Sequence, residues 1–141
     1  KLKGTREKMR KIWILAAAVA LANAAINEAG LNACINKGDA ASCEKTLIEL
    51  EKSCSGGDAL ACYFAAEFYA KGLTGYKDGA KAFAIYKDAC AAGSAESCYE
   101  ESVFYLKGDV APQSFELSGE RLKKACELGS KRACNILELA K

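Results

Sequence analysis

Eight cysteines in four short pairs constrain this chain more than any other feature. The pairs are Cys34/Cys43, Cys54/Cys62, Cys90/Cys98 and Cys126/Cys134. Seven residues separate the cysteines in three pairs, and eight separate them in the first. The last three pairs recur with a fixed step of 36 residues, and a step in that range is typical of repeat architectures.

Each pair has the same local surroundings. The second cysteine lies four residues after an Asp or Ser that favours a helix N-terminus, and a glycine precedes that residue. Glycine suits the left-handed position at which a helix ends. The pattern predicts two helices joined by a tight corner, with the cysteines close enough for a disulfide. Sequential pairing is therefore favoured among the possible connectivities. A zinc site is less favoured, because structural zinc sites use C-x2-4-C knuckles.

The N-terminal segment predicts export. Met9-Arg10-Lys11 is basic, residues 12–21 form a short apolar run, and Ala22-Asn23-Ala24 matches an A-x-A cleavage site. We interpret residues 1–24 as an upstream extension and signal peptide that starts at Met9. Residues 25–141 would then form one domain in the periplasm or outside the cell, where disulfides persist. An ordinary buried helix is the alternative interpretation of residues 1–24.

Charge argues against a nucleic-acid partner. The whole chain carries +2, but residues 1–24 hold six Lys or Arg and one acidic residue. The remainder holds 14 basic and 17 acidic residues and no basic cluster. A weakly acidic domain does not attract a phosphate backbone.

The chain after residue 25 predicts helices throughout. A single proline, Pro112, and few β-branched residues disfavour strands. Short helices of this kind are stabilised by stacking on their neighbours, so we predict an all-α superhelix, or solenoid, of helical hairpins. The expected helices are 26–36, 41–53, 59–71, 79–91, 95–107, 115–128 and 131–140.

These residues resemble Sel-like repeats, a tetratricopeptide-like class. The resemblance rests on the 36-residue step and on the run Ala82…Tyr86…Ala89-Cys90…Gly93…Cys98…Tyr105…Gly108. It covers residues 54–141 well, while residues 25–53 look like a shortened repeat. A cysteine pair in each repeat makes the chain most similar to the cysteine-rich subgroup first described from Helicobacter. The family pattern has Leu-Gly after the second cysteine, where this chain has Ala65-Ala66, Glu101-Ser102 and Leu137-Glu138.

The sequence offers little catalytic chemistry. It contains no histidine, which excludes Ser-His and Cys-His nucleophile pairs and imidazole bases. Cysteines in disulfides are not nucleophiles. Glu96, Glu100 and Glu101 share one helix, and we interpret them as an exposed acidic face. We predict neither a cofactor nor a metal ion.

The resemblance also implies a β-lactamase-like or penicillin-binding activity, because members of the family are catalogued in this way. The chain has one S-x-x-K element, Ser42-Cys43-Glu44-Lys45, of the kind that serine β-lactamases use. The companion S-D-N and K-T-G elements are absent after residue 25. One such four-residue match is expected by chance.

A binding function has better support. Stacked hairpins form a curved solenoid whose concave face is lined by the first helix of each pair. By resemblance to tetratricopeptide packing, that face takes the residues two before, one after and five after the second cysteine. Tyrosines flanked by charges suit a protein or peptide segment, although tyrosines at helical spacing also pack between repeats. The predicted face is Leu60, Tyr63, Glu67, Glu96, Tyr99, Val103, Arg132, Asn135 and Leu139.

We therefore expect an exported, monomeric, disulfide-bridged scaffold that binds a protein or peptide partner. Two alternatives stay open: a weak hydrolase of β-lactams or cell-wall peptides, and an immunity or adaptor protein with one dedicated partner.

Overall fold

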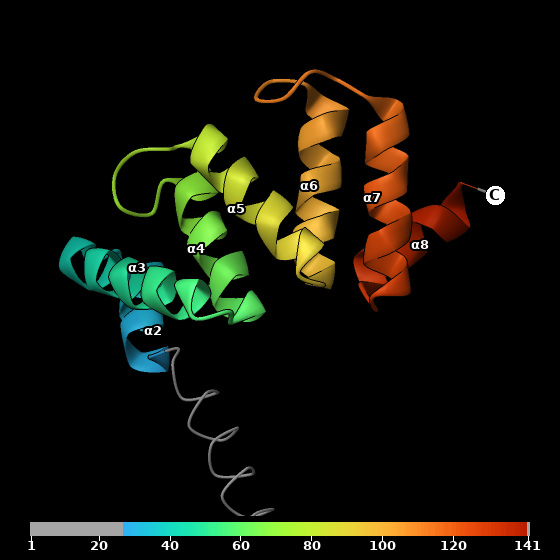
Figure 1. Ribbon diagram of the computed structural model, residues 1–141. Helices are drawn as coiled ribbons and strands as arrows, with labels where there is room; N and C mark the ends of the chain where they lie inside the picture. Colours follow the sequence, from blue (N-terminus) through green and yellow to red (C-terminus); the bar gives the residue numbers. More distant parts are fainter. Residues whose placement is uncertain (1–26, 141) are drawn as a thin grey trace, which may run out of the picture.

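The described part of the protein is a row of helices without strands (Figure 1). The computed structural model describes residues 27–140, so the predicted signal peptide lies outside the described residues. Every helix end lies within two residues of its predicted position, which confirms the all-α solenoid. The helices are α2 (Glu28–Lys37), α3 (Ala40–Ser55), α4 (Ala59–Lys71), α5 (Gly79–Ala91), α6 (Ala95–Lys107), α7 (Phe115–Glu127) and α8 (Lys131–Leu139).

Capping residues start the helices at the predicted positions. The Asp39 carboxylate accepts a hydrogen bond from the backbone N–H of Ser42 at 3.1 Å, and Asp58 accepts one from Ala61 at 3.1 Å. These bonds satisfy N–H groups that a helix leaves free in its first turn. Ser130 takes the same place before α8, but its buried hydroxyl makes no capping hydrogen bond within the described residues.

Each tight corner combines a glycine with a disulfide. The backbone φ angle is +66° at Gly38 and +94° at Gly57, in the left-handed region that favours glycine. The Cα atoms of the bridged cysteines lie 4.5 to 4.7 Å apart. The bridges are Cys34–Cys43 between α2 and α3, Cys54–Cys62 between α3 and α4, Cys90–Cys98 between α5 and α6, and Cys126–Cys134 between α7 and α8. We call these four connections the bridged corners.

The core is built from small residues that let neighbouring helices approach closely. Ala65 and Ala66 on α4 and Ala82 on α5 are fully buried, and the larger Phe68 and Tyr86 fill the space between them. Each helix packs mainly against the helix before it and the helix after it. In a solenoid, each repeat contacts only the repeats next to it.

Polar contacts hold the corner between α4 and α5, which no disulfide bridges. The Tyr69 hydroxyl on α4 donates to Glu51 Oε1 on α3 at 2.6 Å. Lys81 Nζ on α5 donates to the Tyr69 hydroxyl at 2.5 Å and lies 3.0 Å from Glu51 Oε1. Three consecutive helices therefore meet in one hydrogen-bonded group.

The corner between α6 and α7 is held by an ion pair between Glu101 and Arg121. We predicted Glu101 on an exposed acidic face, but its side chain is only 1% exposed. Arg121 Nε on α7 donates to Glu101 Oε1 at 3.0 Å. Glu101 lies three residues after Cys98, where the family pattern has a leucine, and that position faces the next hairpin. The burial of a carboxylate there depends on a charged partner from α7.

Candidate partner-binding face

The nine residues of the predicted face lie on α4, α6 and α8, and the structure joins some of them into one surface. We define the groove face as Tyr63, Glu67, Glu96, Tyr99 and Arg132 of the predicted residues, together with Glu100 on the same helix as Tyr99. The other predicted residues lie around this set: Leu60 and Leu139 are 56% and 88% exposed, Asn135 is exposed, and Val103 is half-buried.

Arg132 on α8 organises one half of the groove face. Its Nε donates to Glu96 Oε2 at 2.9 Å, and its guanidinium lies 3.0 Å from Glu100 Oε1. The same guanidinium stands 4.1 Å from the centre of the Tyr99 ring, in a cation–π contact. Because all three partners are on α6, Arg132 ties the last repeat to the one before it.

Glu67 on α4 organises the other half. The Tyr86 hydroxyl on α5 donates to Glu67 Oε1 at 2.6 Å, and Lys71 forms an ion pair with the same carboxylate. Burial raises the pKa of Tyr86 well above its usual range, and its hydrogen bond to Glu67 adds to the rise. Tyr86 therefore stays a neutral donor at physiological pH and fixes the orientation of Glu67.

The two carboxylates that share Arg132 respond differently to their surroundings. Burial raises the pKa of Glu100, Arg132 opposes the rise, and the negative charge of Glu67 adds to it. Burial also acts against the ionised form of Glu96, but the hydrogen bond and charge of Arg132 and the nearby Ser130 hydroxyl together outweigh it, so the pKa of Glu96 is lowered. Glu100 is the more enclosed of the two, with a side chain 19% exposed against 39% for Glu96.

Tyr63 and Tyr99 are both half-buried. The Tyr63 ring centre lies 5.4 Å from that of Phe64 and 6.1 Å from that of Tyr86. Tyr99 packs against the core cluster around Cys98 on one side and against Arg132 on the other. Each ring thus divides its surface between the core and the groove face.

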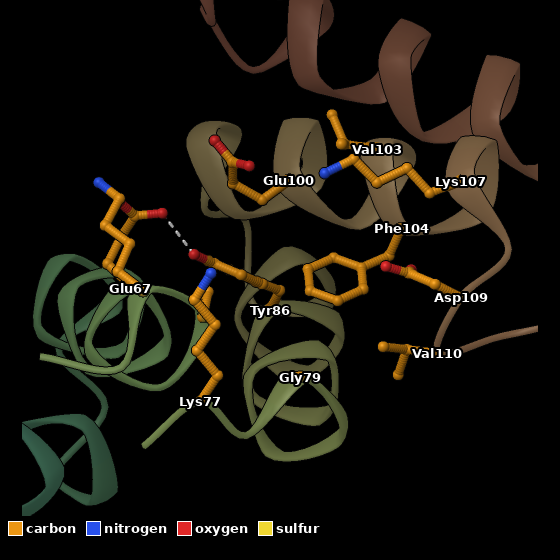
Figure 2. A pocket seen from close by; sticks show the side chains of 12 residues that line it. Glu67, Lys77, Gly79, Tyr86, Glu100, Val103, Phe104, Lys107, Asp109 and Val110 are labelled. Atoms are coloured by element: carbon orange, nitrogen blue, oxygen red, sulfur yellow. Dashed lines mark hydrogen bonds and ion pairs between the residues drawn. The ribbon is translucent and has the colours of Figure 1, made fainter. Parts of the chain in front are cut away.

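A pocket of about 340 Å³ opens beside the groove face, between α4, α5 and α6 (Figure 2). Glu67 and Glu100 contribute to its wall, together with Tyr86, Phe104 and apolar residues. Lys77 and Lys107 also line it. Sequence reasoning did not assign Tyr86, Phe104 or either lysine to a site. Tyr86 belongs to the repeat pattern, but helical spacing alone assigns such an aromatic residue to the core.

The S-x-x-K element lies away from this face, at the start of α3. The Ser42 hydroxyl donates to the Asp39 carboxylate, which caps the helix, and Lys45 is exposed. Within residues 27–140 no hydrogen bond joins Ser42 to Lys45. In the same part of the chain, no group of three or more His, Cys, Asp or Glu residues is placed to hold a metal ion. None of the described helices is long and apolar enough to cross a membrane.

Comparison of the chain with known proteins identifies the fold. No protein-family model matches the sequence, and no curated protein matches it. Cysteine-rich protein B of Helicobacter pylori matches the structure with a TM-score of 0.63 and 25% sequence identity, over 82% of this chain and 93% of that one. The chain is a cysteine-rich, Sel1-like repeat protein.

A second solved structure agrees with this Sel1-like assignment. A Sel1 repeat protein from Oxalobacter formigenes matches with a TM-score of 0.64 and 13% identity, over 77% of this chain and 44% of that chain. At that identity the likeness shows the fold alone. The predicted family and the predicted repeat scaffold are confirmed, and the four disulfides match the cysteine-rich subgroup.

Proposed function

We propose that this Sel1-like protein is an exported, monomeric scaffold that binds a protein or peptide segment across its groove face. The observation that carries the proposal is that Arg132, Tyr99 and Glu67, on three successive repeats, are each held in place by contacts: Arg132 by Glu96 and Glu100, Tyr99 by the Arg132 guanidinium, and Glu67 by Tyr86 and Lys71. Side chains that are already held in place lose little conformational entropy when a partner binds. Tyrosine and arginine are also the residue types that most often dominate binding energy at interfaces.

Export is supported by the cysteine content. Four disulfides in the described residues fit an oxidising compartment, because cytosolic thiols are kept reduced. We propose that residues 1–24 are removed after Ala24, so that the exported product begins at Ala25. The intact mass of protein secreted by a bacterial host tests this. An exported product that retains Trp13 would contradict it.

A displayed library of random peptides tests the binding function without a known partner. The oxidised protein is used for selection, and enriched peptides are then titrated by fluorescence anisotropy. We expect Tyr99→Ala and Glu67→Gln to weaken binding by about tenfold or more, as for hot-spot residues. Phe115→Ala is the matched control, because Phe115 is an exposed aromatic on α7 outside the groove face.

Two results would contradict the proposal. Selected peptides could bind the groove-face variants and the wild type equally well. Alternatively, the library could yield no enriched peptide while a folded partner is recovered by crosslinking, which is the result expected of an immunity or adaptor protein.

A further inference from the structure

The pocket beside the groove face contains two lysines whose charge has no partner. Its wall carboxylates are already paired, Glu67 with Lys71 and Glu100 with Arg132. No ion pair within 4.0 Å involves Lys77 or Lys107 in residues 27–140. The pocket therefore offers two amino groups that are free to bind a carboxylate, while each of its enclosed carboxylates already has a basic partner, which Glu100 shares with Glu96.

The two lysines enter the pocket from opposite sides. Figure 2 shows Lys77 extending from the segment before α5 toward Tyr86, and Lys107 extending back along α6 toward Glu100. The one other charged lining residue without an ion pair in the described residues is Asp109, which is exposed in the loop after α6. These three residues without an ion pair carry two positive charges and one negative charge.

Part of the pocket wall is apolar. Phe104, Val103, Val110 and Ala70 contribute this surface. A volume of about 340 Å³ falls within the range that small-ligand sites occupy. An amine at an apolar, partly enclosed surface binds a carboxylate more strongly than it does in bulk water.

We propose that this pocket binds a carboxylate carried next to a short aliphatic group, as the end or an acidic side chain of a partner segment offers it. Lys77 and Lys107 hold the carboxylate, and Phe104 with the two valines contacts the aliphatic part. The inference rests on the proposed function, because a segment lying on the groove face would deliver this group to the pocket.

Amide chemical shifts of the oxidised, full-length protein test the pocket with small probes. The probes are 4-methylpentanoate and its uncharged analogue 4-methylpentanamide. We expect saturable shifts at Phe104, Lys107 and Val110 with the acid, and binding weaker by about tenfold or more with the amide, since a hydrogen bond to a charged group is lost.

Paired lysine variants provide the control. The double variant Lys77→Gln/Lys107→Gln should abolish the difference between acid and amide. The double variant Lys87→Gln/Lys123→Gln changes the net charge equally at exposed positions outside the pocket and should preserve it. All four lysines are exposed, so the substitutions leave the core unchanged.

Two dipeptides distinguish the sources of the carboxylate. Acetyl-Ala-Leu with a free C-terminus represents a chain end, and acetyl-Leu-Glu-amide represents an acidic side chain. Tighter binding of either one supports the proposal and identifies the source. The proposal is overturned if acid and amide bind alike, if the shifts lie outside the pocket, or if both double variants lose binding equally. Peptide selection on the groove face is a separate measurement, so failure of the pocket and failure of the proposed function are distinguishable.

Discussion

Arg132 forms an ion pair with Glu96, the residue at the equivalent position one repeat earlier. Each lies two residues before the second cysteine of its own repeat, and 36 residues separate them. In a solenoid, equivalent positions of adjacent repeats are neighbours in space. Opposite charges at such positions therefore bring α6 and α8 together along the groove face.

The two acidic partners of Arg132 should respond to pH in opposite directions. The folded-state pKa of Glu100 is raised, so its contribution to stability falls as the pH rises from the unfolded value to the folded one. The folded-state pKa of Glu96 is lowered, so its contribution grows as the pH rises from the folded value to the unfolded one. We expect Glu100→Gln to gain stability relative to wild type as the pH rises above the usual carboxyl range. Relative to wild type, Glu96→Gln should lose stability as the pH rises through the acidic range.

Urea unfolding at a series of pH values measures both differences. The wild type is the common reference, and each variant serves as the control for the other because both lose one partner of Arg132. If the stabilities of both variants changed with pH in the same direction relative to wild type, the opposite pKa shifts of Glu96 and Glu100 would be contradicted.

The buried pair Glu101–Arg121 should be asymmetric under mutation. Arg121→Met leaves the Glu101 carboxylate buried without a partner, and we expect a loss of about 3–5 kcal/mol in the free energy of unfolding. Glu101→Leu removes the buried charge, and the Arg121 side chain, which is 30% exposed, can turn to solvent. We expect that variant to stay within about 1 kcal/mol of wild type. Urea denaturation measures both, and equal losses would show that the pair stabilises the fold by attraction rather than by neutralising Glu101.

Tyr63 and Tyr99 should tolerate truncation better than a fully buried aromatic residue. Because each ring is half-buried, we expect Tyr63→Ala and Tyr99→Ala to cost about 2 kcal/mol each, below the ~3–5 kcal/mol of a core aromatic. Phe68→Ala is the matched comparison, since Phe68 is 1% exposed on α4. Thermal melts measure all three. Tyrosine variants that melt as low as Phe68→Ala would assign both rings to the core.

The disulfides should differ in their rate of reduction. Thiolate attack needs access to sulfur, and Cys34–Cys43 and Cys90–Cys98 are buried, whereas Cys54–Cys62 and Cys126–Cys134 are half-buried. We expect the half-buried pairs to be alkylated first during partial reduction under native conditions. Peptide mapping by mass spectrometry measures the order, and mapping without reduction should find only the four sequential bridges. A bridge between different pairs would contradict the arrangement of the bridged corners.

Local chemistry explains why the fold could be predicted from the sequence. The glycine, the capping residue and the cysteine recur together, so each corner and the helix after it can be placed from neighbouring residues, as for 95–107. The burial of Glu101 could not be predicted in this way, because Arg121 lies 20 residues further along and on another helix. The pocket depends on how two loops pack against α5, which no local pattern encodes. The contact between Glu96 and Arg132 differs from these, because the 36-residue repeat step places the two residues at equivalent positions of adjacent repeats.

The position of the disulfides determines how the protein responds to tension. Four bridges close corners between successive helices, but none spans loops 72–78 and 108–114. Each bridge joins cysteines eight or nine residues apart, so a force that pulls on the two ends meets three groups of helices whose corners are covalently linked: α2–α4, α5–α6 and α7–α8. Between them only non-covalent contacts resist extension, among them those of Tyr69 and Glu101. We expect these groups to separate first under force, while the loops closed by the disulfides stay closed.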